Sequence, residues 1–120
     1  MALTQGDLDH FIGTTQWFKH FLGYLYTEGV RHVAEEGEAY WLLDAIFSWQ
    51  TPTLKSYEHQ FWSLTVTLED ETRNATLQCV SDTLPYGEIL ATQEIGYTDF
   101  PMDHIELWFA NNVLYLPSEH

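Results

Sequence analysis

The fold is decided by the stretch Ala39–Trp49, which reads AYWLLDAIFSW. Only Asp44 and Ser48 in it are clearly polar, and neither glycine nor proline interrupts it. A helix that is apolar nearly all the way round is stable only when most of its surface is covered. The sequence therefore predicts a central helix over residues 39–50, ended by the proline that follows and wrapped by the rest of the chain.

After this helix, the hydrophobic pattern changes to a period of two. From Phe61 to Glu69, apolar and polar residues alternate, which is the pattern of a strand with one buried face. Four more strand-like stretches follow, over residues 75–81, 89–97, 105–109 and 113–116. The last two are joined through Asn111 and Asn112, and asparagine tolerates the positive φ of a tight hairpin.

These patterns together predict an α+β fold, with N-terminal helices packed on one face of a C-terminal antiparallel sheet of about five strands. We expect a single domain over residues 1–120. Residues 1–53 form its mainly helical half, with short helices before the central one over residues 5–12 and 28–36. Residues 60–117 form an antiparallel β-meander.

The cysteine content and the N-terminal sequence indicate the cellular compartment of the protein. A single cysteine, Cys79, excludes an internal disulfide and fits a reducing environment. The first residues lack the basic and apolar regions of a secretory signal, and no segment approaches the ~20 consecutive apolar residues that span a membrane. We therefore expect a cytoplasmic protein without a membrane partner.

The charge of the chain is its most unusual feature. Eighteen acidic residues stand against four basic ones, giving a formal net charge of −14. A field of this sign repels phosphates, so direct nucleic-acid binding is disfavoured. A basic protein partner is favoured, including one that itself handles nucleic acid. Solubility, or adaptation to a salty cytoplasm, is the alternative explanation.

Two dense acidic runs are the candidate partner-binding residues: Glu35, Glu36 and Glu38, and Glu69, Asp70 and Glu71. Carboxylates can take the place of phosphates as partners for arginine and lysine in a basic groove. The alternative is that both runs are simply solvated turns.

Aromatic residues supply a second candidate surface. A small protein cannot easily bury five tryptophans, so exposed aromatic surface is expected near Trp17 or Trp62. The alternative is that these rings line a thick core. The aromatic stretch over residues 16–26 fits neither the helical nor the strand period, so strand and extended loop both stay open.

Catalytic and metal-binding signals are weak. The six histidines include no HExxH motif, and neither a metal site nor a cofactor is expected. Cys79 shares a strand face with Ala75 and Leu77, which predicts a buried, inert thiol. Asp99, Asp103 and His104 would form a site only if they converged with another histidine or acid. No catalytic residue is therefore assigned.

Several segments in this order resemble an uncharacterised family of small bacterial and phage-borne proteins. They are Tyr26–Val30, Ala39–Asp44, the strand from Phe61 to Val66, Tyr97–Pro101 and the ending Leu116–Glu119. The resemblance implies a cytosolic setting and carriage on mobile elements. It implies no catalytic residue.

Three functions from different classes follow. The first is a non-enzymatic acidic binding protein, in its most concrete form a mobile-element-encoded inhibitor of a nucleic-acid-handling or defence complex that acts by DNA mimicry. The second is a small-molecule binding module with an aromatic pocket between helices and sheet. The third is a small hydrolase with a His/Asp site. A homodimer formed through an edge strand ending at Leu116 is a further expectation.

Overall fold

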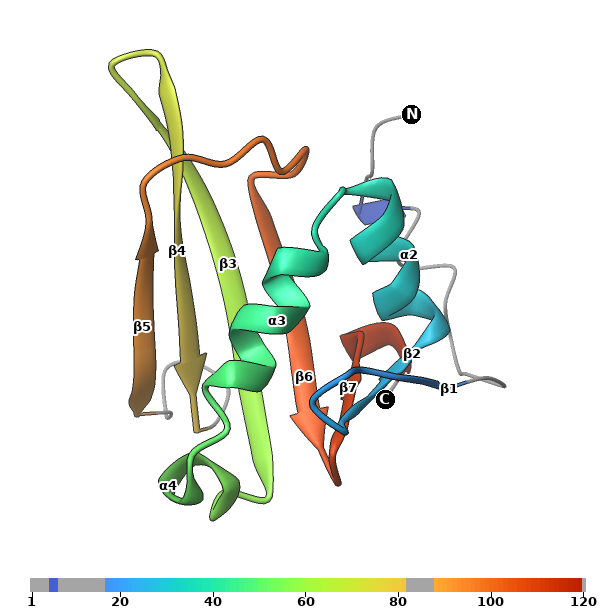
Figure 1. Cartoon of the computed structure of the whole chain (residues 1–120). Coiled ribbons are helices and arrows are strands. Elements are labelled where there is room, and N and C mark those ends of the chain that lie inside the picture. Colours follow the sequence, from blue (N-terminus) through green and yellow to red (C-terminus); the bar gives the residue numbers. More distant parts are fainter. Residues whose placement is uncertain (1–4, 7–16, 82–87, 120) are drawn as a thin grey trace.

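A computed structural model of the chain describes residues 5–6, 17–81 and 88–119. The elements, in chain order, are β1 (Trp17–Lys19), β2 (Leu25–Thr27), α2 (Glu28–Glu36), α3 (Tyr40–Ser48), α4 (Pro52–Lys55), β3 (His59–Glu69), β4 (Thr72–Val80), β5 (Ile89–Ile95), β6 (His104–Ala110), β7 (Val113–Tyr115) and the 3₁₀ turn η1 (Pro117–Glu119). Figure 1 shows their arrangement. The helix expected over residues 5–12 lies outside the described residues except for its first two positions. None of the helices in the described part is long and apolar enough to cross a membrane.

The predicted α+β class is confirmed, but the sheet is larger than expected and is mixed. Seven strands lie in the order β1-β2-β7-β6-β3-β4-β5. The two extra strands, β1 and β2, come from the aromatic stretch that fitted neither period. The short β2 pairs parallel with β7, placing Leu25 opposite Val113. The first half of the chain is therefore not purely helical, and the sheet is not wholly C-terminal or antiparallel.

The strand order also differs from the meander that the sequence suggested. β6 pairs with β3 rather than with β5, so the β5–β6 connection crosses the ends of β4 and β3. Two backbone hydrogen bonds fix this crossing: Thr98 N–H donates to the carbonyl of Arg73 at 2.9 Å, and Val66 N–H donates to the carbonyl of Asp103 at 2.7 Å. β7 lies between β2 and β6. The strand near Leu116 is thus not an edge to which a second copy could add.

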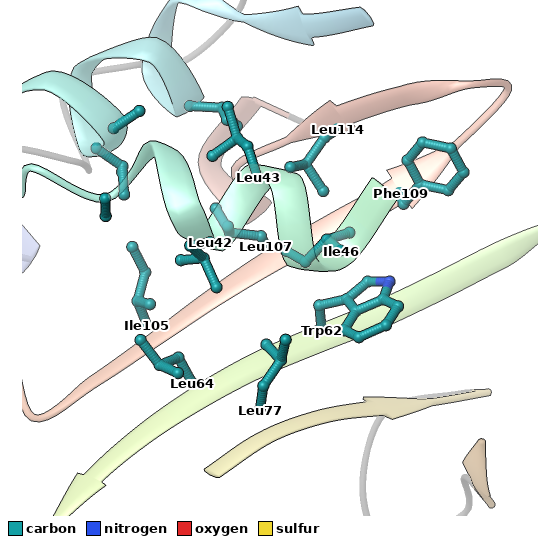
Figure 2. Packing of buried hydrophobic residues seen from close by; sticks show 14 of the residues in the cluster. Leu42, Leu43, Ile46, Trp62, Leu64, Leu77, Ile105, Leu107, Phe109 and Leu114 are labelled. Atoms are coloured by element: carbon teal, nitrogen blue, oxygen red, sulfur yellow. The ribbon is translucent and has the colours of Figure 1, made fainter. Parts of the chain in front are cut away.

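The central helix was placed correctly, and α3 lies across β3 and β6 (Figure 1). Its buried side chains are Leu42, Leu43, Ile46 and Phe47. Figure 2 shows Leu42, Leu43 and Ile46 packed against a layer of sheet residues that includes Trp62, Leu64, Leu77, Ile105 and Leu107. The space between these two layers has no room for a water molecule. Beneath α3, side chains therefore fill the space between helix and sheet.

The start of α2 is tied to the end of the described chain. Thr27 caps the helix by accepting a hydrogen bond from the N–H of Val30. The Glu119 carboxylate accepts from the Thr27 hydroxyl at 2.6 Å and from the Gly29 N–H at 3.3 Å. A side chain on Gly29 would come within 2.6 Å of Leu116, so only glycine permits this close packing. An anion at a helix N-terminus is stabilised by the helix dipole.

Candidate binding surface at the acidic end

Three connections meet at one end of the molecule: the β3–β4 turn, the β5–β6 connection and the α2–α3 turn (top of Figure 1). Arg73 Nη2 donates a hydrogen bond to the carbonyl of Phe100 at 2.6 Å, which holds the first two together. Gly37 lies against the Phe100 ring, so that a Cβ there would come within 2.9 Å of it. Phe100 itself is fully buried and anchors the group.

Eight exposed carboxylates project from these connections and from the adjoining ends of α2 and β3, and we call them the acidic end. They are Glu35, Glu36, Glu38, Glu69, Asp70, Glu71, Asp99 and Asp103. Both acidic runs noted in the sequence thus lie at the same end of the fold. The two aspartates were considered in the sequence only as candidate catalytic groups, and the crossing of the β5–β6 connection brings them here.

Two arginines lie at the acidic end, and each is engaged by one acid. Arg31 Nε is 2.9 Å from Glu35 Oε1, and Arg73 Nη1 is 3.7 Å from Asp103 Oδ1. The hydrogen bond with Glu35, and then its charge, raise the pKa of Arg31. The other six carboxylates have no ion pair with any residue that the structure describes. This end therefore carries a surplus of negative charge that is available to a cation.

The β3–β4 turn holds its acids at a cost in backbone energy. Asp70 and Glu71 both have positive φ, at 48° and 67°. Two-residue hairpin turns of this kind strongly favour asparagine and glycine, and the β6–β7 turn has Asn111 and Asn112 at the same positions. A glutamate in the left-handed region is strained by the order of 1 kcal/mol or more. Carboxylates therefore occupy the β3–β4 turn despite its preference for other residues.

The candidate catalytic residues Asp99, Asp103 and His104 have separate surroundings. The His104 ring nitrogen Nδ1 lies 3.2 Å from the Thr65 hydroxyl, while Asp103 lies beside Arg73. Asp99 is exposed on the connection before them. Among residues 17–81 and 88–119, no group of three His, Cys, Asp or Glu side chains is placed to hold a metal ion.

Comparison with known proteins identifies the family without assigning an activity. Residues 2–120 match the model of a family of unknown function (DUF6876). The chain belongs to this family. The resemblance to an uncharacterised family is thus confirmed. No curated protein and no solved structure matches the chain, so function has to be inferred from the surfaces of this family member.

The two candidate aromatic residues have opposite environments. Trp17, on β1, is 54% exposed, and Phe21 and Leu22 between β1 and β2 are exposed as well. Trp62 is only 1% exposed because its position on β3 faces α3, and its indole N–H donates to Gln60 Oε1 at 2.9 Å. Of the two places where exposed aromatic surface was expected, Trp17 is therefore exposed and Trp62 is not.

Sequence reasoning missed a pair between the buried His20 and the exposed Asp44. His20 Nε2 is 2.6 Å from Asp44 Oδ1, and its Nδ1 accepts a hydrogen bond from the N–H of Leu22 at 3.1 Å. Because Nδ1 is an acceptor, the ring proton lies on Nε2 and points to the carboxylate. Since His20 is buried, the pair fixes the β1–β2 hairpin to α3. The two residues lie on different elements and share no local pattern.

Cys79 is buried within the core, as its strand pattern predicted. Burial raises the pKa of its thiol to about 12, so it stays protonated near neutral pH. A protonated, buried thiol is a poor nucleophile. Cys79 therefore acts as a small core residue.

Proposed function

We propose that this protein is a non-enzymatic binding protein whose acidic end engages a basic protein. The observation that supports this is the gathering of carboxylates from three separate connections at one end of the molecule. The other acidic residues of the described part lie singly on different elements: Glu28, Asp44, Glu58, Glu88, Glu94, Glu106 and Glu119. Acidity that served solubility alone would not require such a concentration.

The proposed partner is a protein that handles nucleic acid. Its arginine and lysine side chains would bind the carboxylates of the acidic end in place of phosphates, since both groups accept charge-assisted, bidentate hydrogen bonds from arginine. The long-range field of a chain with a net charge of −14 would steer such a partner toward this end. Occupation of the phosphate-binding groove would then inhibit the partner by mimicry of DNA.

The test uses two triple variants with the same change in charge. The first is Glu69→Gln with Asp70→Asn and Glu71→Gln, in the β3–β4 turn. The second removes three scattered acids through Glu58→Gln, Glu88→Gln and Glu94→Gln. Each variant and the native protein are used as bait in a lysate of the native host, and the affinity of the captured protein is then measured by calorimetry.

We expect a captured protein with a basic surface whose affinity falls roughly tenfold between about 50 and 300 mM salt. The variant in the β3–β4 turn should lose most of this binding, while the scattered variant should keep it. Equal losses in both variants would mean that only total charge matters. Binding that is indifferent to salt, or no basic protein captured at all, would also refute the proposal.

A further inference from the structure

The face of the sheet turned away from α3, which we call the far face, carries an apolar row across five strands. The strand registers pair Tyr115 with Trp108, Trp108 with Phe61, Phe61 with Val80, and Val80 with Ile89. Residues opposite one another in adjacent strands lie on the same face. The strand registers, with a register shift between Cys79 and Val80 that pairs Val80 with Ile89, therefore assemble a row of three aromatic and two aliphatic residues.

The aromatic rings of this row stand nearly perpendicular to their neighbours. The ring centroids of Phe61 and Trp108 are 5.1 Å apart at an interplanar angle of 85°, and those of Trp108 and Tyr115 are 6.3 Å apart at 84°. Edge-to-face contacts of this kind hold aromatic rings in defined orientations. The row is consequently an ordered wall.

A hollow of about 360 Å³ lies beside this wall. Its lining includes Phe61, Val80, Ile89, His104, Glu106 and Trp108. The volume falls within the range of small-ligand sites, which combine apolar walls with a few polar groups. It is separate from the space beneath α3, where the side chains leave no room.

The lining of this hollow includes a carboxylate and the His104 ring, but no lysine or arginine. Glu106 is exposed and lines it, and Glu94 lies on the same face, where it accepts a hydrogen bond from the Thr76 hydroxyl at 3.2 Å. The four basic residues lie elsewhere: Lys19 on β1, Arg31 on α2, Lys55 on α4, and Arg73 directed to the β5–β6 connection. An anionic ligand would find neither lysine nor arginine here, whereas a cationic one would find a carboxylate.

We propose that this hollow is a binding site for a small organic cation, in which an ammonium or guanidinium group is carried on a compact apolar body. The Glu106 carboxylate pairs with the cationic group, and the rings of Phe61 and Trp108 contact both the cation and the apolar body. The aliphatic side chains of Val80 and Ile89 complete the apolar side. This site is independent of the acidic end and of the basic protein proposed to bind there.

The test compares three probes of matched size that differ in charge: 2-phenylethylamine, 2-phenylethanol and 3-phenylpropionate. Each is titrated into the ¹⁵N-labelled full-length protein, and amide and indole shifts are followed by NMR. We expect the amine to shift signals of β3 and β6 around Phe61 and Trp108, with at least about tenfold higher affinity than the alcohol. The propionate should give no shifts there.

Two variants make the result specific. Glu106→Gln should weaken the binding of the amine at least fivefold, while Glu58→Gln, which removes an exposed acid on another element, should leave it unchanged. The triple variant in the β3–β4 turn should also bind the amine normally. The proposal for the hollow and the proposal for the acidic end can therefore fail independently of each other.

Four outcomes would overturn the inference. They are equal binding of alcohol and amine, shifts that map elsewhere, an unchanged affinity in Glu106→Gln, and no binding of the amine at millimolar concentration. A further titration uses an arginine-containing tripeptide as the ligand. If it binds the hollow more tightly than the free amine, the site belongs to a peptide and the assignment to a small molecule is wrong.

Discussion

Replacement of the acids in the β3–β4 turn should stabilise the fold while it removes charge from the acidic end. The change is Asp70→Asn with Glu71→Gly, which installs the residues that this turn type prefers. Asp70 and Glu71 have φ of 48° and 67°, and both side chains are exposed. The substitution therefore relieves backbone strain without disturbing the core.

The expected gain can be worked out from the backbone. A non-glycine residue in the left-handed region costs of the order of 1–3 kcal/mol, with asparagine and aspartate at the low end. Glycine at the position of Glu71 removes this strain. Part of the gain in stability is offset, by about 0.5–1 kcal/mol, because glycine gives the unfolded chain more conformational freedom. The free energy of unfolding should thus rise by about 1 kcal/mol.

Relief of charge repulsion would also stabilise the variant, so a matched control separates the two effects. Asp70→Asn with Glu71→Gln removes the same charges and keeps a side chain at the strained position. Urea unfolding followed by tryptophan fluorescence, at low and high salt, measures both variants. The glycine variant should exceed the glutamine variant by about 1 kcal/mol at either salt concentration.

A second control lies in the β6–β7 turn, where Asn112 has a φ of 64°. Because asparagine already tolerates this region, Asn112→Gly should gain only a few tenths of a kcal/mol. The reasoning fails if the glycine and glutamine variants of the β3–β4 turn are equally stable. It also fails if Asn112→Gly gains as much as the change at Glu71.

Three further predictions concern the core and the chain end. Glu119→Ala removes the acceptor of the Thr27 hydroxyl at the start of α2 and should cost about 1–3 kcal/mol in urea unfolding. Gln60→Leu leaves the indole N–H of Trp62 unpaired in the core and should cost about 2 kcal/mol, whereas a neutral result would mean that water replaces the amide. Cys79 should react with Ellman's reagent at pH 8 only after unfolding. Because its pKa is raised to about 12 in the fold, its contribution to stability is complete below about pH 9 and lost as the pH rises toward 12, which pH-dependent urea titrations can measure.

The elements that sequence patterns located well are those with a strong local period. The run of apolar residues predicted α3, and the alternation from Phe61 predicted β3, each to within about two residues of the observed ends. β1 and β2 were not predicted because each has only three residues, too few to display a period. The partner of β2, moreover, is the distant β7, and a parallel pairing of this kind leaves no signal in the neighbouring sequence.

Sequence patterns could predict that acidic residues lie in turns, but not that these turns meet at one end of the molecule. Composition requires many carboxylates on the surface, and local charge runs placed Glu38 and Asp70 in turns. Whether separate connections meet depends on strand order. In a meander, the connection that carries Asp103 would turn at the edge of the sheet, away from β3. Its hydrogen bond with the N–H of Val66 exists only because β6 pairs with β3.

The apolar row on the far face could not be predicted either, because it depends on the register between strands. Period-two patterns predict that Phe61 and Trp108 each lie on one face of a strand, but not that they lie opposite each other. Because a shift of one residue would turn every side chain of a strand to the other face, the row exists in one register only. That register is selected by the core, where Trp62 and Leu107 must both face α3. Burial beneath the helix thus fixes, on the opposite side of the same strands, the wall of the proposed cation site.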